Sequence, residues 1–194
     1  MRLTGTEDLR VQKTIDGIYS AFEDLICEKD FDKITVKELC DRARVNKKTF
    51  YRYYPTINDL LAELQDAYYE DFMERTAGMQ IPQDLKEITR EFCMFSARQG
   101  KAYERITCAP SYRTMSTDMK ERILEERPES PDIDGIDGEE ERAMLMAFIT
   151  ESTLAIYRKW VAAGKPVSAE RMTEMAISLV CGGVDNLMKR AENE

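Results

Sequence analysis

Two short helices joined by a three-residue connection are predicted near the N-terminus, and this pattern restricts the fold more than any other feature of the chain. The first helix begins after Thr35, because a threonine followed three residues later by a glutamate is typical of a capping box. The second helix covers 47–54 and follows Asn46, a residue type that often caps a helix N-terminus. Residues 44–46 leave room only for a tight turn. The sequence therefore predicts a helix-turn-helix arrangement.

The longer segments of the chain also have helical patterns. Apolar residues recur at spacings of three and four, as in amphipathic helices, over 11–27, 56–76, 85–95, 112–126, 139–163 and 168–190. A long loop is expected over 127–138, and no strand-like alternation persists. We expect an all-α protein of about nine helices, with a tri-helical helix-turn-helix domain over 1–55 and a second helical domain over 56–194.

Charge is distributed unevenly along the chain, whose formal net charge is -9. Residues 1–55 contain 11 Lys and Arg against 10 Asp and Glu, whereas residues 56–194 contain 17 against 27. Five cations lie close together between residues 42 and 52: Arg42, Arg44, Lys47, Lys48 and Arg52. A polyanion is therefore expected to bind the N-terminal quarter and to be repelled by the rest.

The residue types that carry most metal and enzyme chemistry are missing or scattered. The chain has no histidine, and its five cysteines never occur in a CxxC spacing, which argues against a zinc site or a histidine-based catalytic group. The sequence also lacks a recognisable nucleophile and base pair or a phosphate loop. We predict no catalytic residue, no cofactor and no metal, and an enzyme is the least favoured class.

Neither the N-terminal start nor the apolar runs of the chain indicate a membrane or an export pathway. The first ten residues lack the apolar centre of a secretory signal. The longest apolar run, residues 143–149, is far too short to cross a bilayer. A cytoplasmic protein without membrane contact is therefore expected.

The predicted helix over 47–54 divides into an inner and an outer face. Phe50 and Tyr54 are four residues apart on one face and are expected to pack against the helices behind them. The other side chains remain at the surface or at the N-terminal end: Lys47, Lys48, Thr49, Tyr51, Arg52 and Tyr53. Such side chains donate hydrogen bonds to phosphates and to base edges in the major groove. The residues alone leave two interpretations open, a DNA-binding surface or a solvated basic face.

The segment VNKKTFYRYYPTINDLL resembles the recognition helix and following helix start of the TetR family of bacterial transcriptional regulators, with the pattern V-S-K-G-T-[LF]-Y-x-[HY]-F-x-[ST]-K-x-[DE]-L. The matching positions are Val45, Lys47, Thr49, Phe50, Tyr51, Tyr53, Thr56, Asp59 and Leu60. The resemblance covers about residues 10–65. Asn46 and Lys48 depart from the pattern, where Ser and Gly are usual.

This resemblance implies a role for each residue of the outer face. The residues expected to contact the phosphate backbone are Thr35, Lys47, Tyr51 and Tyr53. The residues expected to lie near bases are Lys48, Thr49 and Arg52. Lys48, where glycine is usual, adds a long cation to this surface.

The last helix carries two apolar stripes, which bears on assembly. The first contains Met172, Met175, Ala176, Leu179, Gly183 and Leu187, and the second contains Ile177, Val180, Cys181, Val184 and Met188. A surface helix of a monomer needs one stripe, so the second is expected to contact another subunit, unless the helix is buried in its own. The interface residues we expect are Trp160, Ile177, Val180, Cys181, Val184 and Met188. The C-terminal part also resembles regulators of the dihydroxyacetone-kinase type, and the family resemblance implies a dimer formed by the last two helices.

A small-molecule site in the second domain is also implied by the resemblance to TetR-like regulators. Its candidate lining residues are Phe72, Phe92, Phe95, Tyr103, Tyr112, Met115 and Phe148, although each would equally suit a helical core. The function expected is a homodimeric repressor that a small-molecule effector releases from a palindromic operator in double-stranded DNA. Alternatives left open are a co-regulator that acts through a partner protein and, least favoured, an enzyme.

Overall fold

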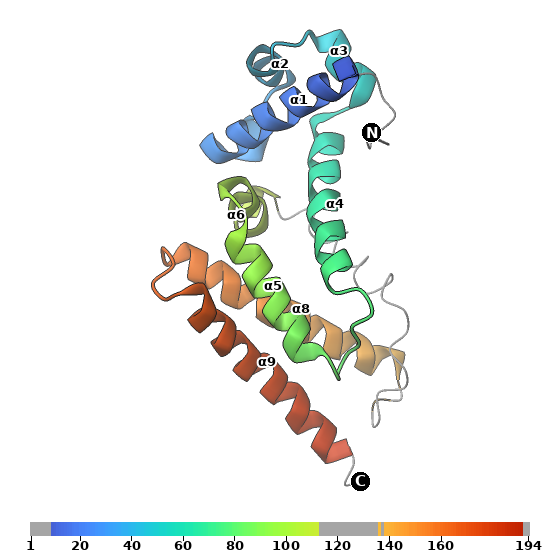
Figure 1. Cartoon of the computed structure of the whole chain (residues 1–194), viewed down its shortest axis with the longest axis vertical. Helices are drawn as coiled ribbons and strands as arrows, with labels where there is room; N and C mark the ends of the chain where they lie inside the picture. The colour runs from blue at the N-terminus through green and yellow to red at the C-terminus, as the bar shows by residue number, and fades with distance from the viewer. Residues whose placement is uncertain (1–8, 113–135, 137, 192–194) are drawn as a thin grey trace. The chain divides into compact units, whose positions relative to one another are not determined.

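The computed structural model describes residues 9–112, 136 and 138–191, which form eight α-helices with no strand among them (Figure 1). The helices are α1 (Leu9–Glu28), α2 (Val36–Ala43), α3 (Lys47–Tyr53), α4 (Ile57–Arg75), α5 (Leu85–Arg98), α6 (Lys101–Cys108), α8 (Glu139–Ala162) and α9 (Ala169–Ala191). The all-α class is confirmed. Met115, almost all of the helix predicted over 112–126 and most of the loop predicted over 127–138 lie outside the described residues.

The chain divides into two compact units, and α4 runs from the first into the second. The first unit takes the described residues of Met1–Tyr69 and Gly100–Met115, and the second takes those of Glu70–Gln99 and Ser116–Glu194. The first unit thus extends beyond the helix-turn-helix domain expected over 1–55. It gains the start of α4, α6 and the short 3-10 helix η2 (Pro110–Tyr112) because their apolar residues complete its core.

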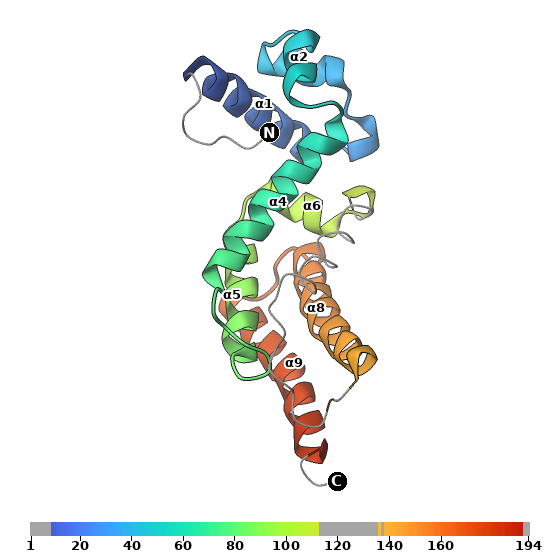
Figure 2. The same ribbon diagram turned by 90° about the vertical axis from the view of Figure 1, so that its right-hand side faces the viewer.

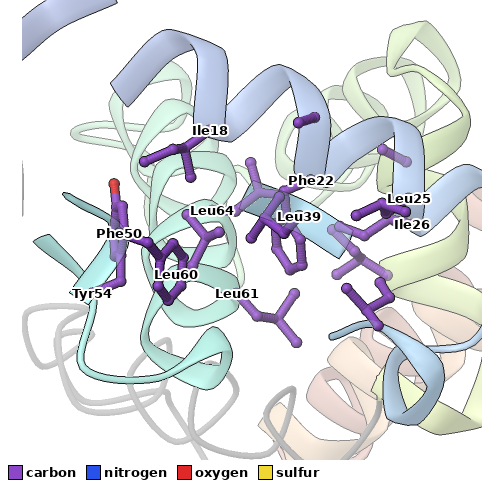
Figure 3. Close-up of a cluster of buried hydrophobic side chains, with 14 of the residues drawn as sticks. Ile18, Phe22, Leu25, Ile26, Leu39, Phe50, Tyr54, Leu60, Leu61 and Leu64 are labelled. Atoms are coloured by element: carbon purple, nitrogen blue, oxygen red, sulfur yellow. The ribbon is translucent and has the colours of Figure 1, made fainter. Parts of the chain in front are cut away.

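One apolar cluster holds the first unit together. Figure 3 shows side chains of α1, including Ile18 and Phe22, pointing toward Leu60 and Leu64 of α4. All four are almost fully buried. Burying one such side chain contributes roughly 1.5–3 kcal/mol. The apolar spacing of α1 that predicted this helix therefore also supplies the core behind α3.

Side-chain caps fix where the short helices begin. Thr35 Oγ1 accepts a hydrogen bond from the Glu38 backbone N–H at 3.2 Å, and Asn46 Oδ1 accepts one from the Thr49 N–H at 2.7 Å. The caps predicted from the sequence are confirmed at both positions. The Glu38 carboxylate pairs with the Lys29 ammonium at 2.6 Å, which ties the start of α2 to the end of α1.

The second unit is built from α5, α8, α9 and the end of α4. Figure 2 shows α5, α8 and α9 lying beside one another, in agreement with the contacts among these three helices. Tyr157 of α8 is fully buried, and its hydroxyl donates to the Ser96 carbonyl of α5 at 3.1 Å. The Trp160 indole N–H donates to the Val167 carbonyl at 2.8 Å and so closes the connection to α9. No helix within the described ranges is long and apolar enough to span a bilayer.

The expected division of α9 into an inner and an outer stripe is wrong for several residues, although Met172 and Ala176 are buried as expected. Val180 and Val184 were predicted to contact a second subunit, yet 0% and 1% of their surface is exposed because they pack inside their own chain. Met175, Leu179 and Leu187, from the stripe expected inside, are exposed at 46%, 60% and 46%. The packed face follows α5 and α8, the two helices that α9 contacts most.

The remaining predicted interface residues are not free either. Trp160 is buried at 8% exposure by its own chain, and Ile177, Cys181 and Met188 are half-buried. Burial raises the pKa of the Cys181 thiol. The apolar surface that α9 leaves open is therefore the one formed by Met175, Leu179 and Leu187.

Candidate nucleic-acid interface

Two aromatic anchors hold α3 against the first unit. Phe50 and Tyr54 are 0% and 1% exposed, and their ring centroids lie 5.7 Å apart. The Tyr54 ring also meets the Tyr19 ring of α1 edge to face at 6.4 Å. Burial raises the pKa of Tyr54 to about 12. Both residues occupy the inner face that their spacing predicted. The opposite side of α3 is therefore held facing away from the core.

The outer side of α3 displays most of the residues predicted to contact DNA. Lys47, Lys48, Tyr51 and Arg52 are exposed, with Tyr51 at 52%, and the Arg52 guanidinium lies 5.8 Å from the centre of the Tyr53 ring. Lysine and arginine bind phosphates, and arginine also reads guanine edges. The structure therefore brings these cations together on one short helix.

The hydroxyl groups of Thr35 and Thr49 differ in their remaining capacity to form hydrogen bonds. Thr35 is exposed, and its oxygen accepts a bond from a backbone N–H, so the hydroxyl hydrogen remains available to a phosphate oxygen. The Thr49 hydroxyl is half-buried and lies 3.0 Å from Asn46 Oδ1, to which it donates. A base contact by Thr49 would thus use its methyl group or its oxygen as an acceptor.

One of the five clustered cations is neutralised within the chain. The Arg42 guanidinium forms two hydrogen bonds with the Glu28 carboxylate, at 2.6 and 2.9 Å. These bonds lower the pKa of the Glu28 carboxyl. Among the described carboxylates, none forms an ion pair with Arg44, Lys47, Lys48 or Arg52. The basic run thus provides four cations for an external anion, a difference that the sequence could not reveal because the ion pair joins residues 14 positions apart.

Comparison with known proteins finds a family whose sequence pattern matches part of this first unit. Residues 18–64, which include α2, α3 and the start of α4, match the family described as bacterial regulatory proteins, tetR family. The chain is similar to TetR family regulators over this segment. It is 27% identical over 95 residues to the HTH-type transcriptional regulator YdeS of Bacillus subtilis (strain 168), a match that covers 47% of this chain and 46% of that protein. The chain thus spans about half the length of the curated relative it matches.

Solved structures of TetR family proteins have the same fold along most of the chain. A TetR transcriptional regulator from Streptococcus agalactiae 2603V has a TM-score of 0.64 at 20% identity, over 88% of this chain and 95% of that one. The dihydroxyacetone kinase operon activator DhaS has a TM-score of 0.53 at 16% identity, over 89% and 96%. At these identities the similarities show the fold alone.

Three of the residues predicted to line a ligand pocket form an aromatic cluster. Phe72, Phe92 and Phe95 pack on one another in the second unit, with Phe72 ring centroids 5.8 and 6.3 Å from the other two. Phe92 also meets Tyr157 at 6.3 Å. Aromatic rings stabilise one another in such contacts, and Phe72 and Phe95 are buried whereas Phe92 is half-buried.

The other predicted pocket residues lie in different surroundings. Tyr103 and Tyr112 belong to the first unit, where Tyr103 packs edge to face on Tyr68 at 4.9 Å and Tyr112 donates to the Lys29 carbonyl at 3.2 Å. Phe148 is 44% exposed on α8. Since Met115 lies outside the described residues, the ligand pocket stays a prediction.

Phe148 lines a hollow between α8 and α9. The hollow has a volume of about 500 Å³ and is lined by Ile136, Glu141, Met144, Leu145, Phe148, Gly183, Val184 and Leu187. A methyl group at Gly183 would lie 3.2 Å from the Phe148 ring, so glycine allows the aromatic side chain to approach the α9 backbone. This apolar surface is continuous with the stripe that α9 leaves open.

The cysteine and carboxylate side chains are the groups that could form disulfides or metal sites. All five cysteines are free thiols, and burial raises the pKa of Cys93 to about 11. Within residues 9–112, 136 and 138–191, His, Cys, Asp and Glu side chains form no group that could hold a metal ion.

Proposed function

We propose that this protein is a homodimeric transcriptional repressor of the TetR family that binds a near-palindromic operator in double-stranded DNA. The observation that carries the proposal is the outer side of α3, where Lys47, Lys48 and Arg52 are exposed and form no ion pair with a described carboxylate. The opposite side is anchored by Phe50 and Tyr54. A rigid cationic helix is the element that such regulators insert into a major groove.

We assign the contacts on the phosphates and the bases separately. Backbone contacts are proposed for Thr35, Lys47, Tyr51 and Tyr53, and base contacts are proposed for Lys48, Thr49 and Arg52. The excess of Asp and Glu over residues 56–194 supports this assignment, because it disfavours other routes for DNA to bind. A regulator of this kind acts in the cytoplasm and needs no cofactor or catalytic residue.

The dimer is proposed to use the apolar surface of α8 and α9 that the chain leaves open. It comprises Met144 and Phe148 on α8 with Met175, Leu179 and Leu187 on α9. Two copies would supply the two α3 helices that a palindromic site with half-sites about 34 Å apart requires. Leu179→Glu should yield monomers in sedimentation, whereas Ser178→Glu, an equal charge on an exposed neighbouring position, should leave the dimer intact. A dimer that survives Leu179→Glu unchanged would rule out this surface.

The experiment that tests the DNA-binding function is a selection of genomic fragments at low salt followed by sequencing. A repressor should recover fragments that share an inverted repeat and lower the output of a reporter placed behind that repeat. If no fragment is recovered, the repressor proposal is wrong and the co-regulator alternative is favoured. If the repeat is recovered but the reporter output rises, the protein is an activator, as the name of its structural relative DhaS indicates for that protein.

We also propose that a small molecule releases the protein from this operator, as is common in the family. A compound that acts in this way should lower the affinity for the selected repeat and raise the unfolding temperature of the free protein. A compound library that changes neither quantity would remove support for effector control.

A further inference from the structure

Arg44 adopts a backbone conformation that arginine disfavours. It follows α2 with φ 56° and ψ 38°, in the left-handed region. The Val45 N–H donates to the Cys40 carbonyl at 3.0 Å across this turn, and the Arg44 N–H donates to the Asp41 carbonyl at 3.4 Å. Helices commonly end in this way with glycine, because any side chain with a Cβ atom is strained there. The turn requires the conformation, but the turn does not require an arginine.

The Arg44 side chain also makes no polar contact within the part of the chain that the structure describes. It is exposed and forms no ion pair or hydrogen bond among those residues. Arg42, only two residues earlier, is in contrast fully engaged with Glu28. A strained residue whose side chain contacts nothing in its own protein is a candidate for a role with a partner.

The second non-glycine residue with positive φ offers a comparison within the same molecule. Lys165 follows α8 with φ 57°, and its ammonium lies 5.4 Å from the centre of the Trp160 ring. There the unusual residue is used locally, because its cation stabilises the packing at the helix end. Arg44 has no such contact, so its function must be sought outside the chain.

We propose that Arg44 is a further DNA-contacting residue that binds a backbone phosphate beside the site read by α3. The inference rests on the proposed DNA-binding function. Arg44 lies two residues before the Asn46 cap of α3, in the same turn that leads into the cationic helix. A guanidinium group can bind a phosphate through two parallel N–H donors and stays charged at any physiological pH. Keeping arginine where glycine would relax the backbone then has a physical reason.

The test compares the stability and the DNA binding of Arg44→Gly with those of the full-length wild type. Relief of the left-handed strain should raise the unfolding midpoint by about 2 °C. Loss of one phosphate contact should reduce the slope of log affinity against log salt by about 0.9, measured on a fragment recovered by genomic selection. Arg44→Lys, which keeps the charge, should retain most of the slope. Effects of opposite sign on stability and affinity are not expected of a purely structural residue.

A matched control removes the same kind of strain and the same charge elsewhere. Lys165→Gly should leave the salt slope unchanged, because Lys165 lies in the second unit. If Arg44→Gly folds poorly, Arg44→Asn, which tolerates the same conformation without charge, gives the measurement instead. If the wild type binds DNA and the uncharged variant has the same salt slope as the wild type, the Arg44 inference alone is overturned. Absence of any wild-type DNA binding overturns the proposed function together with this inference.

Discussion

Replacing Phe50 by alanine should unfold the surface that α3 presents, although Phe50 itself would touch no DNA. Phe50 is the only buried residue within the seven residues of α3, and it is 0% exposed. Removing a fully buried phenylalanine costs about 3–5 kcal/mol, a large part of the roughly 5–15 kcal/mol that stabilises a typical domain. With an m-value of about 2 kcal/mol/M in urea, the midpoint of the first unit should fall by about 2 M.

Tyr51→Ala provides the matched comparison one residue further along the same helix. Tyr51 is 52% exposed, and its main contact is an edge-to-face meeting with Phe50 at 5.5 Å. Such a contact contributes about 0.5–1 kcal/mol, so the midpoint should fall by no more than about 0.5 M. DNA binding should nevertheless weaken, because the proposed phosphate contact is lost.

Hydrogen exchange distinguishes the two variants when it is measured at increasing urea on peptides from α1, α2 and α3. Phe50→Ala should lose protection across all three helices, whereas Tyr51→Ala should keep nearly wild-type protection while its DNA affinity drops. If both variants shifted the midpoint equally, the division of α3 into an anchored side and a binding side would be refuted.

Two further outcomes follow from local features of the first unit. Thr56→Ala should lower the stability of α4 by about 1 kcal/mol because it removes a helix cap. Thr56 Oγ1 accepts from the Asp59 N–H at 3.2 Å, and the Asp59 carboxylate accepts from the Thr56 N–H at 2.8 Å. Equal urea midpoints for Thr56→Ala and wild type would contradict this prediction. Burial raises the pKa of Tyr54 from 10.0 to about 12, so the folded state holds this proton more tightly than the unfolded state. The stability that this proton contributes is complete below about pH 10 and is lost as pH rises toward 12. Over this range the urea midpoint should therefore fall less in Tyr54→Phe than in wild type. Equal falls of the urea midpoint in the two proteins would refute this prediction.

Local signals in the sequence predicted the first unit well. Thr35 and Asn46 cap their helices through side-chain bonds that span three residues, and Phe50 and Tyr54 share a face because of their four-residue spacing. Interactions of this range are specified by adjacent residues alone. The anchored recognition helix could therefore be predicted from the order of its residues.

Longer-range choices could not be read in the same way. α9 carries apolar residues on more than half of its circumference, and its sequence does not say that α5 and α8 cover Val180 rather than Leu179. The same limit applies to Phe72, since an aromatic residue at helical spacing suits a core and a ligand pocket equally. The side chain of Arg42 is neutralised by Glu28 on another helix, a contact that the local sequence does not reveal.

The central claim, that the outer side of α3 binds the DNA backbone, is tested most directly by the salt dependence of affinity for a selected fragment. The comparison is between wild type and Lys47→Ala, since Lys47 is exposed and pairs with no described carboxylate. The variant should bind every sequence more weakly, and its slope of log affinity against log salt should be smaller by about one. An unchanged slope with unchanged affinity would show that DNA does not contact this side of the helix.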